Sequence, residues 1–437
     1  MSVLRRTPRP SALALVAAAL LAGGLSAVPA ATSTAEPAPS APSAPSAPSA
    51  PPGFLVPTSA RGESLPAPRA VTGQSSLVSL KTSLLPGRAE GQPIRFDLGK
   101  QSVTGRFTHI ERNRAYTAWS GDLDVDNGSF FIVRSGSTYR ASIISPQGLF
   151  EVTQAEGSRY WLTAVAPYPG PPSGNDTAIR AASPAQRALM AAAARTPAAP
   201  SERGRTRIDV LFAYTPAAKA SAGSKAALKA AVGQVAAVTN YALTNSGVKA
   251  QIRVKGIVRT KGKASTNVIK DLRRLQRPHD RFFDSAVRAR AKRHADIVHL
   301  FTDGPPTRMC GAGAEPRTIR EATPLAGAST SYLSCLPYIV PTHELGHNLG
   351  ADHISYPGVS HFSRMRGAYA WYDVPHHFLT ALGYYDPCSD VGDYTCVRIP
   401  LFSNPKGNYF GFAIGSKRAD NAKVIKRFAP IVARYSR

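Results

Sequence analysis

Hydrophobic and polar residues alternate in a series of short runs between about residues 90 and 166. The runs are PIRFDLG, SVTGRFTHIE, AYTAWSGDL, GSFFIVRSG, TYRASIIS, GLFEVTQAEG and SRYWLTAVA. Glycine, asparagine and serine separate them, and a period of two is typical of strands that bury one face. The pattern therefore predicts a compact all-β unit.

From about residue 205 the pattern changes, and strand-like segments alternate with helix-like ones. Strands are predicted in RIDVLFAYT, KAQIRVKGIVRT, DIVHLFTDG and LAGASTSYL. Helices are predicted in SKAALKAAVGQVAAVTNYALTNSGV, in one or two segments before residue 294, in YIVPTHELGHNLG and in AKVIKRFAPIVARYS. This order predicts an α/β domain over 205–437, in which helices pack on a sheet.

The part of the chain before residue 205 divides into three segments. Residues 1–31 have a basic start, a short apolar run and a small-residue cleavage site, which together are typical of a signal peptide. Residues 32–60 repeat Ala-Pro-Ser, which cannot pack a core and predicts a disordered spacer. Residues 61–204 hold the β-rich unit, a helix from Ser183 to about Arg195 and a Pro- and Arg-rich linker.

The signal peptide changes how the rest of the composition is interpreted. No later apolar run is long enough to cross a bilayer, so we expect a secreted monomer without a membrane span. An even number of cysteines in an oxidising compartment favours two disulfides. Three connectivities are open, and we prefer the local pairs Cys310–Cys335 and Cys388–Cys396. A four-cysteine zinc site is disfavoured because no C-x-x-C pair occurs.

The net charge of +26 suggests nucleic acid as a partner only for a cytosolic protein. The basic residues are thickest over 259–296, where they predict amphipathic helices with solvated outer faces. We expect no nucleic-acid partner, and an anionic surface polymer stays open as a ligand.

The run HELGHNLGADH, residues 343–353, carries the clearest chemistry in the chain. On a helix, His343 and His347 project from one face one turn apart, and Glu344 lies beside them. Gly350 is suited to end the helix in a left-handed conformation, which returns His353 as a third ligand. Three histidines and an open fourth position are typical of a catalytic zinc ion, with Glu344 as general base.

Chance is a poor explanation of this motif. H-E-x-x-H alone occurs by chance in about 1% of chains of this composition. Requiring Gly350 and His353 as well lowers that chance to roughly one in 10⁵. The other seven histidines lack ligand spacing, and we interpret them as ordinary core or surface residues.

The same run matches H-E-x-x-H-x-x-G-x-x-H, and the chain thereby resembles the metzincin metallopeptidases. Together with RIDVLFAYTPAA, DIVHLFTDG, CGAGA, LTALGYYDPC and FSNP, it is similar to the bacterial peptidyl-Asp metallopeptidases and their reprolysin-like relatives. The resemblance implies a catalytic domain with a twisted sheet, backing helices and an active-site helix, above a small irregular lower lobe. It implies that substrate runs along an edge strand, for which LAGASTSYL is our candidate, and that 32–204 is a propeptide.

One position departs from the family pattern. The family carries a methionine turn below the zinc, whereas TALGYY places Leu382 there. Leucine is close to methionine in volume and apolarity, so it can form the same floor. Tyr384 lies two positions further on, where some metzincins carry a tyrosine that steadies the oxyanion.

We therefore predict a secreted zinc-dependent endopeptidase, made as a zymogen, that hydrolyses protein substrates. His343, His347 and His353 bind Zn²⁺, Glu344 is the general base, and Tyr384 assists. Two alternatives stay open: a catalytically weakened metzincin-fold binding protein, suggested by Leu382, and a cationic surface-binding protein, suggested by net charge. The residue preferred at the cleavage site is not readable from the sequence.

Overall fold

The structure is a computed structural model that describes residues 51–58, 73–87, 91–124, 128–145, 148–168, 201–202, 204–277, 279–305 and 309–436. The chain divides into two units, Met1–Ser49 and Ala50–Arg437, and all described residues lie in the second. The predicted signal peptide, most of the predicted spacer, the helix predicted over 183–195 and the start of the linker lie outside the described residues. Among the helices that are described, none is long and apolar enough to cross a membrane.

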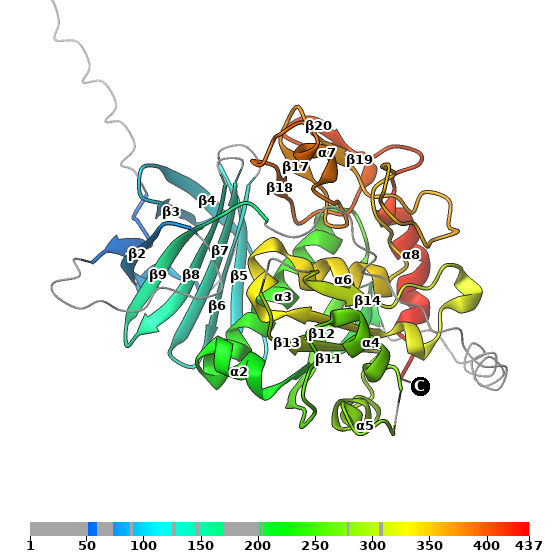
Figure 1. The fold of residues 1–437 in the computed structure, drawn as a ribbon. Coiled ribbons are helices and arrows are strands. Elements are labelled where there is room, and N and C mark those ends of the chain that lie inside the picture. Colours follow the sequence, from blue (N-terminus) through cyan, green and yellow to red (C-terminus); the bar gives the residue numbers. More distant parts are fainter. Residues whose placement is uncertain are drawn as a thin grey trace, which may run out of the picture. The chain divides into compact units, whose positions relative to one another are not determined.

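The first part of the second unit is a nine-stranded antiparallel sheet, called here the N-terminal sheet, with the order β1-β2-β9-β8-β7-β6-β5-β4-β3 (Figure 1). Its strands are β1 (Leu55–Pro57), β2 (Ser75–Leu80), β3 (Pro93–Asp97), β4 (Ser102–Arg112), β5 (Thr117–Leu123), β6 (Ser129–Ser135), β7 (Thr138–Ser145), β8 (Gly148–Glu156) and β9 (Arg159–Val165). The seven runs between residues 93 and 166 thus all form strands, as the alternation predicts. A bridge between Gly53 and Arg95 joins the segment before β1 to β3, so the two edges of the sheet meet.

The spacer prediction over 32–60 is wrong at its end. Phe54 is completely buried and Leu55 is 2% exposed, and both belong to the core of the N-terminal sheet. They are the first large apolar residues after the Ala-Pro-Ser repeats, so the chain enters the fold as soon as it has side chains to bury.

The second part of this unit is built around a mostly parallel sheet, called here the α/β sheet. Its order is β10-β11-β13-β15-β14, and β12 pairs with β11. The strands are β10 (Ser201–Glu202), β11 (Arg205–Tyr214), β12 (Ala250–Arg259), β13 (Ile297–Thr302), β14 (Gly311–Gly313) and β15 (Ala328–Tyr332). The four strands predicted from the sequence are present as β11, β12, β13 and β15.

The edge strand was predicted wrongly. LAGASTSYL forms β15, but β15 is covered on its outer side by the antiparallel β14, which pairs Gly311 with Ser331 and Gly313 with Ser329. The short glycine-rich CGAGA run therefore provides the edge. Glycine is depleted in strands, so propensity does not mark this segment as one.

Helices pack on the α/β sheet as the alternating pattern predicts. They are α2 (Pro216–Ala222), α3 (Lys225–Asn245), α4 (Val268–Leu275), α5 (Asp284–Lys292), α6 (Val340–Asn348) and α8 (Asn421–Val432), whereas the short α7 (Asp386–Ser389) lies among the small strands after α6. Short 3₁₀ helices lie at Thr82–Leu84, Ile319–Glu321, Pro324–Ala326 and Leu333–Tyr338, the last of which (η4) leads into α6. Side chains of Thr215, Ser224, Asn267 and Asp420 cap α2, α3, α4 and α8.

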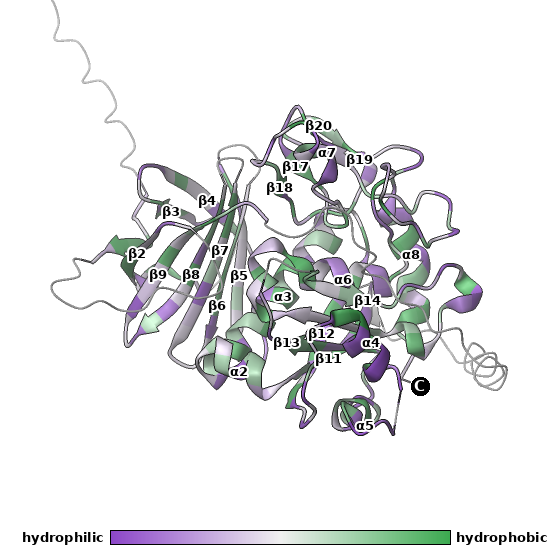
Figure 2. Cartoon of the chain, in the orientation of Figure 1, coloured by the Kyte–Doolittle hydropathy of each residue, from purple (hydrophilic) through white to green (hydrophobic). Residues whose placement is uncertain are grey.

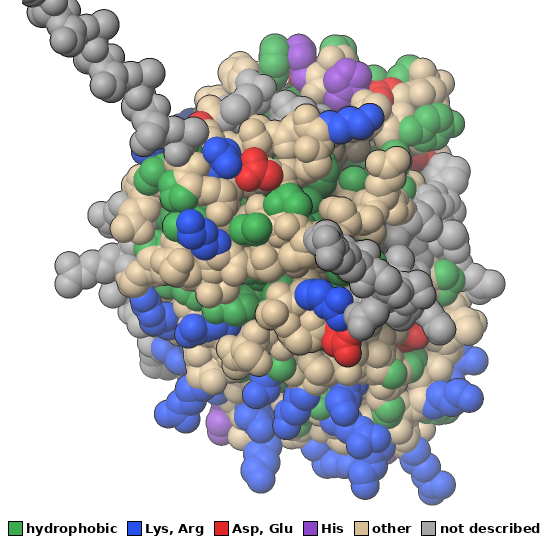
Figure 3. Space-filling model, turned by 90° about the vertical axis from the view of Figure 1, so that its left-hand side faces the viewer, with side chains coloured by type: hydrophobic (Ala, Val, Ile, Leu, Met, Phe, Trp, Pro, Cys, Tyr) green, Lys and Arg blue, Asp and Glu red, His purple; other side chains and the backbone are tan. Residues whose placement is uncertain are grey.

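The basic segment forms α4 and α5 and has the predicted solvated character. Lys270, Arg273 and Arg288 are exposed, and most of α4 is hydrophilic in Figure 2. Asp271, by contrast, is buried and bonds inward to the backbone of Ser265. Figure 3 shows Lys and Arg side chains crowding the lower part of one face, with few acidic groups between them.

After α6, the chain forms several small strands. The strands are β16 (Tyr372–Asp373), β17 (Phe378–Leu379), β18 (Val397–Arg398), β19 (Asn404–Tyr409) and β20 (Phe412–Ile414). Disulfides join Cys310 to Cys335 and Cys388 to Cys396, which confirms the local pairing. The first of them joins the residue before β14 to η4, and so holds the edge strand near the segment that leads into α6.

Candidate metal centre

The three histidines of the sequence motif come together at the end of α6. His343 and His347 lie on the helix, and Gly350 follows it with φ of 78°, the left-handed turn that the spacing predicts. A Cβ at Gly350 would lie 2.6 Å from the Phe428 ring of α8, so close packing and backbone conformation both require glycine here. The turn returns His353, and all three histidines are at most 2% exposed.

The imidazole nitrogens are arranged as in a metal site. Nε2 of His353 lies 2.9 Å from Nε2 of His347 and 3.3 Å from Nε2 of His343. Each Nδ1 lies near a backbone carbonyl oxygen instead: Ala381 for His343 and Ala351 for His347, both at 2.9 Å, and Ser360 for His353 at 3.2 Å. With the Nδ1 hydrogens donated to carbonyls, the three Nε2 lone pairs converge on one point, which fits a single divalent ion.

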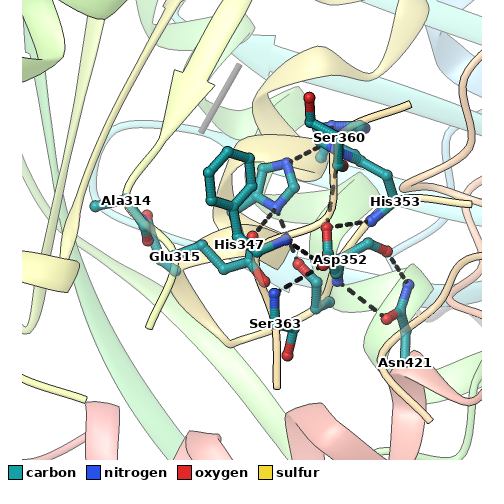
Figure 4. A network of polar contacts seen from close by, with 12 residues as sticks. Ala314, Glu315, His347, Asp352, His353, Ser360, Ser363 and Asn421 are labelled. Atoms are coloured by element: carbon teal, nitrogen blue, oxygen red, sulfur yellow. Dashed lines mark hydrogen bonds and ion pairs between the residues drawn. The ribbon is translucent and has the colours of Figure 1, made fainter. Parts of the chain in front are cut away.

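Buried polar residues around the loop after Gly350 hold His353 in place (Figure 4). Asp352 is completely buried; its Oδ1 accepts from the His353 N–H at 2.7 Å, and its Oδ2 accepts from the N–H groups of Phe362 and Ser363. Asn421 at the start of α8 donates to the Asp352 carbonyl and accepts from the Asp352 N–H. The sequence pattern indicates neither residue, because Asn421 is distant in the chain and Asp352 is not a ligand.

Two further polar residues position α6 and were also missed. Asn348 donates to three carbonyls, those of Ala314, Ala326 and Ala328, at 2.8 to 2.9 Å. Glu315 is fully buried, with a carboxylate oxygen 3.6 Å from Nδ1 of His347. Asn348 lies inside the motif, but nothing in the sequence shows that it bonds to segments 20 to 34 residues away.

Glu344 lies against the backbone of the edge strand. It is 1% exposed, and a Cβ at Gly311 would come within 2.3 Å of its Oε1. A Cβ at Gly313 would lie 2.7 Å from the Glu344 carbonyl oxygen and 2.8 Å from Cβ of His347. The glycines of β14 therefore let the edge strand approach the histidine helix closely enough to leave the carboxylate beside it.

The TALGYY segment packs against α6 and beside the histidine rings. Leu382 is completely buried, and its Cδ2 is 2.8 Å from where a Cβ on Gly346 would lie, so it packs directly under α6. The ring of Tyr384 lies 4.5 Å from the His353 ring and 5.9 Å from the His343 ring, measured between centroids. Both residues that the sequence singled out are thus at the centre.

Arg398 holds this segment in place through hydrogen bonds. Its guanidinium donates to the Gly383 carbonyl at 2.8 and 3.1 Å and to the Tyr338 carbonyl at 3.2 Å. It is 6% exposed, and it lies 5.1 Å from the centre of the Tyr385 ring. Because Gly383 precedes Tyr384, these bonds hold Tyr384 close to the start of α6.

Of the other histidines, His361 interacts electrostatically with Asp352 and His353, whereas His299 and His377 lie away from the centre. His299 lies in the centre of β13, where burial lowers its pKa to about 3 and its ring nitrogens lie 2.9 Å from the hydroxyls of Ser329 and Ser331. His377 lies near Asp393 and Cys396, but the sulfur of Cys396 is in a disulfide and is not available as a thiolate ligand.

A comparison with protein-family models finds a match to the segment that contains the histidines. Residues 229–354 match the family model described as metallo-peptidase family M12B reprolysin-like. This segment is similar to the reprolysin-like metallopeptidases. The matched range starts inside α3 and ends just after His353, so it contains all three histidines and Glu344. The match supports a zinc protease, and the histidine cluster of the reprolysin-like segment is placed to bind the metal.

Similarity to individual proteins is low. None of the curated proteins matches the chain. Among solved structures, one described as a chaperone-substrate complex is 18% identical with a TM-score of 0.41, covering 54% of this chain, which spans 36% of that one. Metalloproteinase-II from Bacteroides fragilis is 15% identical with a TM-score of 0.37, covering 64% of this chain and 88% of that one. Likenesses at this level do not establish a common fold for the whole chain.

Proposed function

We propose that the chain is a secreted zinc-dependent endopeptidase of the metzincin type, made as a zymogen. The observation that carries this proposal is the convergence of three Nε2 atoms while each Nδ1 is engaged by a carbonyl. A structural zinc site has four protein ligands, whereas three leave a position for water and substrate. His343, His347 and His353 are the proposed ligands.

A zinc ion held there supplies a Lewis acid that lowers the pKa of water and polarises a carbonyl. Glu344 is the proposed general base: it takes a proton from the attacking water and passes it to the leaving amine. Its place against β14 supports this role, because a peptide that pairs with the edge strand would run past the same carboxylate. Tyr384 is proposed to donate a hydrogen bond to the oxyanion.

Export and latency rest on other features of the chain. The two disulfides favour an oxidising compartment, in agreement with the signal-like N-terminus. The cysteines all belong to the segment 310–396, so a propeptide thiolate is not available to block the metal. We propose that bulk or a non-thiol group keeps the zymogen inactive and that cleavage near 195–205 is required to relieve the inhibition.

The decisive experiment compares metal content and hydrolysis in the same preparations. The parent should contain one zinc per chain, degrade casein and lose activity with a chelator. Glu344→Gln should keep its zinc and lose roughly 10²- to 10⁴-fold in activity, as expected when a general base is removed. His347→Ala should lose the zinc itself, which is a readout independent of activity.

Glu156→Gln serves as the control, since this exposed glutamate lies in the N-terminal sheet. It should match the parent in zinc content and activity. Substantial hydrolysis by Glu344→Gln would overturn the mechanism. Stoichiometric zinc without hydrolysis in the processed parent would favour a binding protein that keeps the metal site.

A further inference from the structure

Helix α3 presents a polar face whose partners lie in the N-terminal sheet. Gln234 is 2% exposed and donates to the Glu151 carboxylate at 3.0 Å, while its own oxygen accepts from Arg140. Glu151 is 1% exposed and also accepts from Arg140 at 2.8 Å. The three side chains form one buried network, with two members from the sheet and one from the helix.

Further along the same face, two more residues bond to the sheet. The Asn240 amide donates to Glu111 at 3.0 Å while its oxygen accepts from the Ile252 N–H of β12 at 2.7 Å. The Tyr241 hydroxyl donates to Asp122 at 2.5 Å, and its ring meets the Phe131 ring edge-on. Asn240 thus couples the N-terminal sheet through α3 to the α/β sheet.

The apolar part of this interface is packed as tightly as a protein core. A Cβ on Gly233 would lie 2.7 Å from both the Tyr116 ring and a Val133 methyl. Tyr116, Phe131 and Val133 from the N-terminal sheet share one continuous core with the buried residues of α3. Thirteen of the 21 residues of α3 are buried, which shows that the helix is covered on more than one side.

We propose that the N-terminal sheet stays bound to α3 as a separate subunit after the linker before residue 205 is cut. The contacts above join β5, β6, β7, β8 and the end of β4 to α3, and none of them uses the linker. Separation would expose the apolar face of α3 and strip Gln234 of its partners, which is the situation of an obligate interface. Cleavage and release are then two distinct events.

This association has a consequence for the metal centre. Tyr168, which follows β9, stacks on Tyr385 with ring centroids 5.4 Å apart and meets Tyr338 edge-on at 5.0 Å. The Tyr338 hydroxyl donates to the Ala166 carbonyl at 3.0 Å. A sheet that stays bound keeps Tyr168 packed on Tyr385, the neighbour of Tyr384. Linker cleavage by itself therefore leaves the metal centre covered on the side of Tyr384.

The experiment uses the full-length Glu344→Gln protein, so that the result does not depend on peptidase activity. A site for a specific protease is inserted in 196–200, the chain is cut there, and the product is run on a sizing column at micromolar concentration. Both fragments should elute together at the volume of the uncut protein. Two separate peaks in native buffer would overturn the proposal.

Two variants test whether the α3 face holds the fragments together. Gly233→Leu inserts a side chain where there is no space, so the cut protein should separate into its fragments, whereas Lys225→Leu, exposed on the same helix, should stay associated. If uncut Gly233→Leu fails to fold, Gln234→Ala replaces it and should lower the urea concentration at which the cut fragments part. A Gln234→Ala protein that parts at the same urea concentration as the parent would contradict the assignment of this face.

Discussion

At the scale of single residues, Tyr384 is the side chain whose chemical role is most open to test. Its ring lies against His353 and His343, and Arg398 holds the preceding residue in place. If the hydroxyl steadies the oxyanion, Tyr384→Phe should lower kcat by about 10- to 1000-fold while zinc content holds, as for loss of one transition-state donor. Tyr394→Phe, at a tyrosine 64% exposed, is the control. A Tyr384→Phe enzyme as fast as the parent would make this tyrosine structural.

Leu382 is the residue at which this chain departs from the metzincin pattern, and the structure places it where the pattern needs an apolar floor. Leu382→Met should leave the fold intact and change zinc affinity only modestly, because volume and apolarity are kept. Leu382→Asp should lower the melting temperature sharply and reduce zinc content, since a carboxylate would be buried under α6 and could compete for the ion. Thermal unfolding and metal analysis of both variants measure this; equal stability of the two would show that Leu382 is not packed there.

At the scale of elements, the fit between β14 and α6 decides where Glu344 lies. Gly313→Ala should force the edge strand and the histidine helix apart, because a Cβ there meets the Glu344 carbonyl at 2.7 Å and His347 at 2.8 Å. We expect activity to fall by at least about 10-fold, given how steeply catalysis depends on placement. Steady-state kinetics and zinc content together separate misplacement of Glu344 from loss of the metal.

A matched glycine substitution controls for this effect. A Cβ at Gly87 would have no heavy atom within 4 Å, and the backbone conformation of Gly87 is one that other residues can adopt. Gly87→Ala should therefore leave activity unchanged. Full activity of Gly313→Ala would mean that β14 and α6 are free to move apart without disturbing the chemistry.

At the scale of the whole molecule, the N-terminal sheet and the α/β sheet are joined by a stretch that contains the predicted processing site. We expect the mature protein to begin between about Arg195 and Arg205, where the sequence passes from an Ala-rich segment to the first strand of the α/β sheet. N-terminal sequencing of the fragment that carries α6, separated from the N-terminal sheet under denaturing conditions, checks this. A start of this fragment before residue 150 would contradict it, because the chain that carries the candidate metal centre would then still include part or all of the N-terminal sheet.

Much of the fold follows from local sequence patterns. Period-two alternation marked seven strands of the N-terminal sheet, and helical periodicity marked α3, α6 and α8, because one buried face imposes the period on each element. Several strands were not predicted, among them β1, which is short and follows a repetitive segment, and β14, which is built of glycine and alanine. Each has too few side chains to show a pattern, and only pairing with neighbours makes it a strand.

The candidate metal centre likewise has one part that the sequence predicts and another that it does not. Eleven consecutive residues contain the three histidines, Glu344 and the turning glycine, so the spacing on α6 and the turn after it bring the candidate ligands together. Tertiary structure alone decided the rest: Asp352 with Asn421, the three carbonyls bound by Asn348, the brace of Arg398 and the edge position of β14. These partners are far apart in the chain, and what unites them is a hydrogen bond or a packing contact that exists only once the sheets and helices have assembled.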